Sequence, residues 1–465
     1  MNSKYLKSSH VVVKQCNDHA VIYHRHLGNA VTVGKKVVQL LELAARGIDA
    51  RGASRVFGER ADGILRILQS LHERGFLRRA QEPERDLDDI ALSRYPDRVL
   101  RLYITEMCNM ACTYCFERLK KSPRTMEPSL VLSAARAYCK WLLAQKDQDF
   151  DRLKVNYFGG EPMLEFSVLR QTEREIRRAL EPYRDRLRVT MNTNGTLITG
   201  DAAKWLVDNT VHVFISIDGT RQTHDQQRLM AGGGGSFDRV IKGVQALLDE
   251  ADGAYIDECL TVLCTITPKN VAELNSIATY FKHLGVRNIS FNPAFNCTHS
   301  PVSSEWTSLD RPQMEMFIRT VIDLQAELLR EHVHVGGSWG FIPERLRSGG
   351  SVFCQAAGHE VGVAADGMLF PCPCVFGDSR HSIGRLTADE SFEMTPEYDR
   401  WAGRTSRRME QCRDCPIACV CRGGCAGVNC LRDRELYEPL QCEFWKMFVD
   451  SYLQTAPVST PGRGM

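Results

Sequence analysis

The chain has 465 residues, 25% of them charged, and a formal net charge of +2. This balance gives no reason to expect nucleic acid or an anionic membrane surface as a partner. No apolar segment approaches the roughly 18 residues that a bilayer-spanning helix needs, and the N-terminus lacks the hydrophobic core of a signal peptide. We therefore expect a cytoplasmic protein without membrane association, long enough for two or three domains with separate cores.

The eighteen cysteines fall into two dense groups and a scattered remainder. Three lie within residues 108–115, and ten lie between Cys354 and Cys442 inclusive. A long chain without an export signal is expected in a reducing compartment, where disulfides are disfavoured, so the dense groups indicate metal ligation. The scattered thiols are expected to pack as small hydrophobes; they are Cys16, Cys139, Cys259, Cys264 and Cys297.

Residues 1–85 are predicted to form a small winged-helix-like domain. Short strands are expected at His10–Gln15, Ala20–His24 and Ala30–Val33, with turns at Asn17-Asp18 and Leu27-Gly28-Asn29. Apolar residues at helical spacing then predict three helices. These are a helix from Val37 to near Gly47, one over Ala53–Phe57, and one through Ile64 and Leu71 that stops at Gly75. Residues 81–95 are charged and contain proline, which suits a linker.

This first domain has three interpretations. A helix-turn-helix would bind DNA, but the third helix carries charges of both signs (Arg66, Glu73, Arg74) where a DNA-binding helix presents a basic face. A structural cap without a ligand is the second interpretation. The third is recognition of an extended peptide that adds a strand to an open sheet edge, and it depends on the resemblance described below.

Residues 95–335 alternate between strand and helix, which predicts an α/β domain with a parallel, barrel-like sheet, a partial (β/α)6 barrel. Helical patterns such as Leu130–Leu143 and Phe237–Leu248 separate the strands. In such folds the chemistry gathers at the carboxyl ends of the strands. The expected strands are Val99–Thr105, Leu153–Phe158, Leu187–Thr193, Val211–Ile217, Cys259–Thr267 and Asn288–Asn292.

The first strand ends at the loop Cys108-Asn-Met-Ala-Cys112-Thr-Tyr-Cys115. Zinc sites normally take four protein ligands, and no fourth Cys or His lies close by in the sequence. A 4Fe–4S cluster held by three cysteines instead leaves one iron open to a small chelating ligand.

Polar motifs follow the next three strands. The second strand ends in Gly159-Gly160-Glu161-Pro162, where glycines let a ligand approach the backbone and a carboxylate accepts hydrogen bonds from an ammonium group. A plain turn that opens a helix explains this loop equally well when it is taken alone. The third strand ends in a polar cluster that includes Asn194, and the fourth in Ser216-Ile-Asp218-Gly219, with Arg228 downstream.

With these motifs at successive strand ends, the chain resembles the radical SAM enzymes. The resemblance implies that Cys108, Cys112 and Cys115 hold a 4Fe–4S cluster whose open iron takes the amino and carboxylate groups of S-adenosylmethionine (SAM). It implies that Tyr114 lies against the adenine and that the Gly159-Gly160-Glu161 loop holds the amino group. In enzymes with the Ser-x-Asp-Gly pattern a polar side chain holds the ribose, here from Ser216 or Asp218, and an arginine, here Arg228, pairs with the carboxylate, a role that suits the guanidinium fork.

A long helix is expected over residues 306–332, and Gly336-Gly337 breaks the chain before a cysteine-rich segment at 340–450 and a tail at 451–465. This segment resembles the seven-cysteine SPASM domain of radical SAM enzymes. The resemblance gives Cys412, Cys415, Cys421 and Cys442 to one auxiliary 4Fe–4S cluster. It gives Cys354, Cys372 and Cys425 to a second one nearer the substrate, with Cys374 as the nearest spare thiol for its fourth position. Substrate or water is the alternative there, and Cys419 and Cys430 are left over.

Two further observations bear on the clusters and the reaction. A zinc ribbon on Cys412, Cys415, Cys421 and Cys425 is the structural alternative. Sulfatase-maturing relatives carry an Asp that serves as base directly after the Cys equivalent to Cys372, whereas this chain has Pro373 at that position. Asp366 and Asp378 lie near Cys372 in the sequence, but nothing else suggests either of them as a replacement base. The sequence therefore identifies no catalytic base.

The function implied is hydrogen abstraction by a 5′-deoxyadenosyl radical from a ribosomally made precursor peptide, forming a thioether or carbon–carbon link. The resemblance places a PqqD-like domain for the peptide's leader at residues 1–85 and implies a reductant protein such as flavodoxin or ferredoxin. Modification of an enzyme subunit, of the sulfatase or quinohaemoprotein type, is the alternative. A metal-sensing DNA regulator is a remote one, and it leaves the strand-end motifs without purpose.

Overall fold

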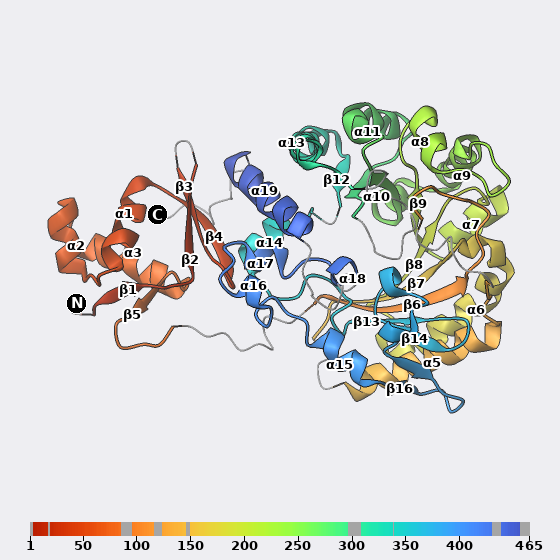
Figure 1. Cartoon of the computed structure of the whole chain (residues 1–465), viewed down its shortest axis with the longest axis horizontal. Coiled ribbons are helices and arrows are strands. Elements are labelled where there is room, and N and C mark those ends of the chain that lie inside the picture. The colour runs from red at the N-terminus through yellow and green to blue at the C-terminus, as the bar shows by residue number, and fades with distance from the viewer. Residues whose placement is uncertain are drawn as a thin grey trace.

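The computed structural model describes residues 3–16, 19–84, 95–115, 123–145, 149–295, 308–337, 339–429 and 439–455. Figure 1 shows an N-terminal unit at one end of the molecule and a large sheet flanked by helices at the other, with the last helix, α19 (Pro439–Thr455), between them. None of the helices in the described part of the chain has both the length and the apolar character that crossing a bilayer requires.

The N-terminal unit contains the three strands and three helices that the sequence predicts. Helix α2 begins three residues before its expected start because Asp49 caps it, accepting a hydrogen bond from the Gly52 backbone N–H at 2.7 Å. The expected turn at Asn17-Asp18 lies outside the described residues. The elements are β2 (Val11–Gln15), β3 (Ala20–His24), β4 (Gly28–Val33), α1 (Lys35–Ala44), α2 (Ala50–Phe57) and α3 (Ala61–Glu73).

A second small sheet was not predicted. Strand β1 (Tyr5–Lys7) pairs antiparallel with β5 (Leu77–Arg79), and so joins the start of the unit to its end. Each strand has three residues, too few for an alternating pattern to stand out in a sequence.

Both faces of the sheet β2–β3–β4 are covered. Ile22 and Val31 pack into a core with α1, α2 and α3, whereas Val21, Tyr23 and Ala30 on the opposite face belong to the core of the rest of the molecule. Two ion pairs hold this face in place: Lys14 with Asp450 at 2.6 Å and Arg25 with Asp414 at 2.8 Å. A further chain can therefore reach this sheet only along its edges.

The large sheet has eleven strands in the order β12-β11-β10-β9-β8-β7-β6-β13-β14-β15-β16. Strands β6 to β12 run parallel in sequence order, which confirms the predicted repeat of strand and helix. The bounds are β6 (Asp97–Thr105), β7 (Arg152–Gly159), β8 (Leu187–Thr193), β9 (His212–Ser216), β10 (Leu260–Ile266), β11 (Asn288–Pro293) and β12 (His334–Gly336).

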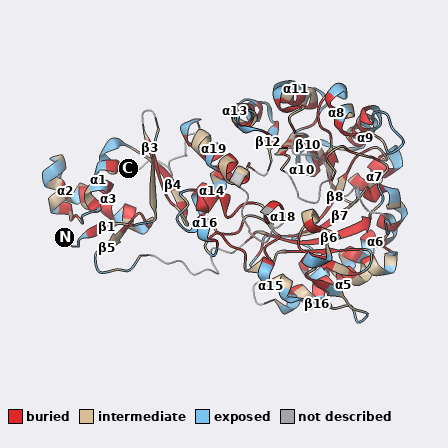
Figure 2. Cartoon of the chain, viewed as in Figure 1, coloured by how far each residue is buried: buried red, intermediate tan, exposed pale blue. Residues whose placement is uncertain are grey.

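Helices cover the outer side of these strands (Figure 1), and much of the length of the strands is buried (Figure 2). Buried apolar runs such as Leu100–Ile104 explain why the parallel strands are legible in the sequence. The helices are α5 (Pro128–Ala144), α6 (Phe166–Ala179), α7 (Gly200–Asp208), α8 (Arg221–Gln227), α9 (Phe237–Glu250), α10 (Gly253–Cys259), α11 (Leu274–His283) and α13 (Arg311–Leu328).

Three boundaries differ from the predictions. Cys259 ends helix α10 and does not begin the strand. The helix expected over 306–332 is shorter, Arg311–Leu328, because a reciprocal cap between Asp310 and Gln313 sets its start. Gly336, expected to break the chain, is the last residue of β12, which pairs parallel with β11.

The C-terminal segment continues the same sheet. Helix α14 (Ile342–Ser348) precedes β13 (Glu360–Val363), which pairs parallel with β6 and leads into an antiparallel meander. The remaining elements are β14 (Met368–Phe370), β15 (Gly384–Leu386), β16 (Phe392–Met394), α15 (Pro396–Ala402), α16 (Glu410–Arg413), α17 (Ala418–Cys421) and α18 (Ala426–Asn429).

Candidate active site

The motifs of the first four strands meet at one edge of the sheet because β6 to β9 run parallel and all end there. Backbone hydrogen bonds fix the cysteine loop that follows β6. Ala111 N donates to Leu229 O at 2.7 Å, Thr113 N to Gln227 O at 2.8 Å, and Ala231 N to Asn109 O at 2.9 Å. The segment after α8 thus acts as a short partner strand for this loop.

Within the loop the three thiols differ in exposure. Cys108 is exposed, Cys115 is half-buried and Cys112 is buried. Burial raises the pKa of the Cys112 thiol, and the Arg228 guanidinium opposes this shift. Thiolates are the ligands that iron–sulfur clusters take, and the exposed Cys108 leaves the loop open on one side.

The glycine pair after β7 is required by the neighbouring backbone. A Cβ on Gly159 would lie 2.2 Å from Thr105 O, and one on Gly160 would lie 2.2 Å from Met107 O. The two chains are hydrogen-bonded here, with Gly160 N donating to Thr105 O at 2.8 Å and Glu161 N to Met107 O at 2.9 Å. The glycines therefore hold the start of the cysteine loop against β7.

Glu161 is fully buried and accepts three hydrogen bonds from the chain. Its donors are Met163 N at 3.0 Å, the Thr193 hydroxyl at 2.7 Å and Asn194 N at 2.7 Å. Burial raises the pKa of the Glu161 carboxyl to about 7, and these hydrogen bonds oppose the shift. The side chain thus joins the ends of β7 and β8 at the edge of the site.

Asn194 ties the third strand end to the cysteine loop. Its amide nitrogen donates to Asn109 Oδ1 at 2.8 Å and lies 3.9 Å from Cys108 Sγ. Asn109 in turn donates to the Thr196 hydroxyl at 2.8 Å. Sequence reasoning missed Asn109, because the cysteine spacing treats the residues between the ligands as arbitrary.

Asp218 is the centre of a buried network after β9. Its Oδ2 lies 2.9 Å from Arg228 Nε and accepts a 2.5 Å hydrogen bond from the Tyr114 hydroxyl, while Oδ1 accepts from Thr265 N at 3.0 Å. The Arg228 guanidinium also lies over the Tyr114 ring, 5.5 Å from its centroid. Arg228 Nη1 is 3.9 Å from Cys112 Sγ, so one arginine joins Asp218, Tyr114 and a thiol of the cysteine loop.

Ser216 is placed differently from the other predicted residues. It is the half-buried last residue of β9, and no hydrogen bond links its side chain to Asp218 or Arg228 among the described residues.

His224, which stands between Gly219 and Arg228 in the sequence, is also part of this network. Its Nδ1 accepts from Asp218 N at 3.2 Å, and its Nε2 lies 2.9 Å from the Ser236 hydroxyl. Burial lowers the pKa of His224 to about 4, so the ring is neutral at pH 7. Nδ1 as acceptor requires Nε2 to carry the proton, which the ring donates to Ser236.

Four cysteines of the C-terminal segment line one small cavity. Cys412, Cys415, Cys421 and Cys442, called the outer group below, surround about 30 Å³ together with Lys446. Burial raises the pKa of Cys412 to about 11, and the neighbouring Cys442 and Cys415 add to this shift. These are the cysteines that the resemblance gives to one auxiliary cluster.

A second set, Cys354, Cys372, Cys374 and Cys425, is called the inner group. Burial raises the pKa of Cys354, and Cys425 and Cys372 raise it further. A hydrogen bond from Cys374 lowers the pKa of Cys425 to about 6. A Cβ on Gly427 would lie 2.5 Å from Cys374 Cβ and 3.2 Å from Cys372 Sγ, so this glycine leaves room for both side chains.

The all-thiol donor sets of both groups fit iron–sulfur clusters or zinc. Within the ranges that the structure covers, no three Cys, His, Asp or Glu side chains are arranged to share one metal ion, whereas a cluster spreads its thiolates over several irons. Of the two leftover thiols, Cys419 is fully buried, and Cys430 lies outside the described residues.

The inner group is attached to the main sheet by aromatic stacking. Phe376 follows Cys374 by two residues and stacks on Tyr103 of β6, with ring centroids 3.5 Å apart and an interplanar angle of 7°. The two carboxylates that lie near Cys372 in the sequence both form ion pairs, Asp366 with Arg124 and Asp378 with Arg380. Neither is therefore available as a base in this arrangement.

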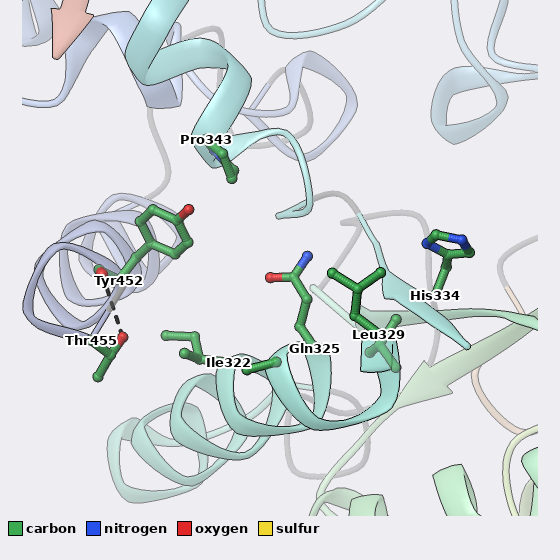
Figure 3. A pocket seen from close by; sticks show the side chains of 9 residues that line it. Ile322, Gln325, Leu329, His334, Pro343, Tyr452 and Thr455 are labelled. Atoms are coloured by element: carbon green, nitrogen blue, oxygen red, sulfur yellow. Dashed lines mark hydrogen bonds between the residues drawn. The ribbon is translucent and has the colours of Figure 1, made fainter. Parts of the chain in front are cut away.

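A larger cavity of about 440 Å³ lies between α13, β12, α14 and α19 (Figure 3). Ile322, Leu329 and Pro343 contribute apolar side chains, and Tyr452 comes from α19. Its lining includes no residue of the cysteine loop or of the strand-end motifs, so it is separate from the site described above.

Comparisons with known proteins agree with this geometry. Residues 102–278 match the model of the Radical SAM superfamily. The chain is similar to the cysteine-type anaerobic sulfatase-maturating enzyme of Clostridium perfringens, with 24% identity over 353 residues that cover 74% of this chain and 92% of the relative. It is also similar to the radical SAM cyclopropyl synthase TigE of Paramaledivibacter caminithermalis, with 22% identity over 71% of this chain and 68% of the relative.

Two solved structures share the fold. One is anSMEcpe with bound AdoMet and Cp18Cys peptide, at a TM-score of 0.62 and 20% identity, covering 77% of this chain and 97% of that one. The other is Streptococcus suis SuiB bound to precursor peptide SuiA, at a TM-score of 0.53 and 15% identity, covering 94% of this chain and 99% of that one. These structures confirm the predicted fold class, and the match of residues 102–278 to the Radical SAM superfamily, together with the curated relatives, confirms the predicted enzyme class, a radical SAM enzyme. The cofactors of this class are a 4Fe–4S cluster and SAM.

Proposed function

We propose that this radical SAM enzyme modifies a ribosomally made precursor peptide, forming a thioether or carbon–carbon link with loss of two hydrogen atoms. The observation that carries the proposal is the continuity between the two cysteine-containing regions. Strand β13 pairs with β6, and Phe376 of the inner-group loop stacks on Tyr103 of β6. The strand that leads to the first cysteine loop thus also supports the inner group.

The chain's own residues would prepare the reaction. When bound, the 4Fe–4S cluster and SAM supply a radical that removes a hydrogen atom from the peptide. Cys108, Cys112 and Cys115 would hold that cluster, and Tyr114, Gly159, Gly160, Glu161, Asn194, Ser216, Asp218 and Arg228 would hold SAM. Arg228 offers a fixed cation for a carboxylate because Asp218 and Tyr114 restrain it. The buried Glu161 offers carboxyl oxygens as hydrogen-bond acceptors at the strand ends.

The outer and inner groups would hold two auxiliary clusters, with Cys374 as the fourth ligand of the inner one. Its contact with Cys425 and its position beside Cys372 at Gly427 support this assignment. A closed inner cluster would pass electrons and would not bind a substrate thiolate.

The N-terminal unit would bind the leader of the peptide in the manner of a PqqD-like domain. Its sheet β2–β3–β4 is covered on both faces, which leaves an edge for an added strand. SuiB, which is similar over 94% of this chain, has been solved with its precursor peptide. A flavodoxin or ferredoxin would supply electrons.

Modification of an enzyme subunit is the second candidate, because the sulfatase-maturating enzyme of Clostridium perfringens is similar over 74% of this chain. Pro373 at the position of the expected base weighs against it.

The test is anaerobic incubation of the reconstituted protein with SAM, dithionite and a candidate peptide encoded by a neighbouring short reading frame. Mass spectrometry should find 5′-deoxyadenosine and a peptide lighter by two hydrogen atoms. The variant with Cys108, Cys112 and Cys115 replaced by Ala should form neither product. A Cys412→Ala variant should still cleave SAM yet fail to form the modified peptide. If a sulfatase-derived peptide reacts and the precursor peptide does not, the second candidate replaces the first.

A further inference from the structure

Three buried arginines surround the two cysteine groups of the C-terminal segment. Arg345, Arg404 and Arg422 are only 5%, 7% and 9% exposed. Among the described residues none of the three forms an ion pair with a carboxylate. Another buried arginine, Arg228, does have such a partner, Asp218 at 2.9 Å, and the half-buried Arg101 lies 2.6 Å from Glu360.

The three guanidiniums donate to backbone carbonyls. Arg345 donates to Val420 O at 2.9 Å and Phe353 O at 2.7 Å, and Arg404 donates to Gly424 O at 3.0 Å and Gly423 O at 2.7 Å. Arg422 donates to Cys419 O at 3.0 Å and to Gly349 O. Arg404 Nε is buried with no hydrogen-bond partner among the described residues. Carbonyl oxygens accept from two nitrogens of each guanidinium but carry no charge, so they leave three positive charges uncompensated.

Burying a charge without a counter-ion costs free energy, and buried charges are therefore usually paired with a group of opposite charge. Two of these charges also lie close together, since Arg345 donates to Val420 O and Arg422 donates to the neighbouring Cys419 O. Glu344 precedes Arg345 in the chain, but among the described residues it forms no ion pair with Arg345 or Arg422. A stronger negative charge is needed nearby.

The cysteines are placed to supply it. The two carbonyls that accept from Arg345 belong to Val420, which precedes Cys421 of the outer group, and to Phe353, which precedes Cys354 of the inner group. Arg404 donates to the carbonyls of Gly423 and Gly424, which lie in the chain between Cys421 of the outer group and Cys425 of the inner group. Arg422 adjoins Cys421 in the chain.

We propose that the iron–sulfur clusters held by the outer and inner groups are the counter-charges of Arg345, Arg404 and Arg422, and that these arginines raise the reduction potentials of both clusters. The proposal rests on the cluster ligands given under the proposed function. A cluster gains one negative charge when it takes up one electron, so a fixed buried cation stabilises the reduced form. Charge and hydrogen bonding near a cluster set its potential, and the low dielectric of the interior strengthens the effect.

The test is an anaerobic redox titration of the full-length reconstituted protein, read by electron paramagnetic resonance. Cys108, Cys112 and Cys115 are replaced by Ala throughout, so that only the auxiliary clusters give signals. Arg404→Gln removes the charge, Arg404→Lys keeps it, and Arg413→Gln is the matched control. Arg413 lies between Cys412 and Cys415 in the sequence, but its side chain is exposed, so solvent screens its charge.

Arg404→Gln should make reduction of the auxiliary clusters at least tenfold less favourable, a shift of 59 mV toward negative potential for a one-electron couple. Arg404→Lys should keep most of the original potential, and Arg413→Gln should leave it in place. An unchanged potential in Arg404→Gln with full iron content overturns the proposal, as does an equal shift in Arg413→Gln.

Cluster loss gives a second readout. If Arg404→Gln loses iron and sulfide while Arg404→Lys retains them, the charge is needed for assembly, which supports the counter-charge role. Equal loss in both variants means that Arg404 acts by shape alone and overturns the proposal. None of these measurements needs a peptide, so they stay distinct from the test of the proposed function.

Discussion

The ion pair between Asp218 and Arg228 gives the sharpest test of how the site is held. Asp218 is fully buried and the Arg228 side chain is 9% exposed. The change Asp218→Asn keeps the shape but leaves the guanidinium buried without a carboxylate. Breaking a buried pair from one side costs about 3–5 kcal/mol.

For a unit of the size of the sheet and its helices, each kcal/mol corresponds to about 2–4 °C in melting temperature, so Asp218→Asn should lower it by roughly 6–20 °C. The assay is thermal unfolding of the cluster-free protein, followed by circular dichroism at one scan rate. Equilibrium dialysis of SAM should show weaker binding by the reconstituted variant, because Arg228 is no longer held in place.

The double variant Asp218→Asn/Arg228→Gln separates the charge from the packing. With both charges removed no unpaired cation remains, so the double variant should melt above the single one. Two contacting residues are expected to couple by about 0.5–3 kcal/mol. Two outcomes would contradict a stabilising ion pair. One is a melting temperature of Asp218→Asn within about 2 °C of the parent. The other is a loss of stability in the double variant equal to the sum of the losses in Asp218→Asn and Arg228→Gln.

Three other predictions follow from the contacts at the strand ends and in the N-terminal unit. Gly160→Ala places a Cβ 2.2 Å from Met107 O and should reduce the iron bound by the first cysteine loop. Gly232→Ala is the control and should leave the iron content unchanged, because no atom lies within 4 Å of its Cβ. Equal iron content in the two variants would contradict this prediction. Burial raises the pKa of Glu161 from 4.5 to about 7, so its contribution to stability is present below pH 4.5 and is lost as pH rises to about 7. The melting temperature should therefore fall across this pH range, and Glu161→Gln should reduce that fall. An unchanged dependence of melting temperature on pH in Glu161→Gln would count against the prediction. Val13→Pro in β2 and Thr32→Pro in β4 each remove a backbone N–H from one edge strand. One of the two variants should bind a labelled leader peptide at least tenfold more weakly, while circular dichroism shows an intact fold. Normal binding by both variants would exclude strand addition.

The parallel strands were predictable because they are buried on both faces. Leu100, Leu102 and Ile104 of β6 are fully buried with few polar interruptions, and such runs are visible in any sequence. The three-residue strands β1, β5 and β12 were not predictable, because their pairing partners are set by contacts between segments far apart in the chain.

The identity of the site residues was predictable, but their connections were not. The strand-end motifs name Glu161, Asp218 and Arg228, yet nothing in their spacing shows that Tyr114 donates to Asp218 across 104 residues. The glycine pair was expected to admit a ligand, whereas the structure requires it for the backbone of Thr105 and Met107. The burial of Arg345, Arg404 and Arg422 was not predictable from the sequence, because arginine is usually a surface residue.

The N-terminal unit and the segment that carries the outer group are in contact, so a cluster on the outer group would affect how that unit is held. Arg25 pairs with Asp414, which stands between Cys412 and Cys415, and Cys16 donates to Leu453 O at 3.2 Å. Tyr23 is close enough to Cys419 and Cys415 for their charges to act on its hydroxyl, although burial is the larger cause of its raised pKa. A cluster on the outer group would fix the backbone on both sides of Asp414, because two of its ligands flank that residue. Filling the outer group would therefore restrain the surface against which the N-terminal sheet packs.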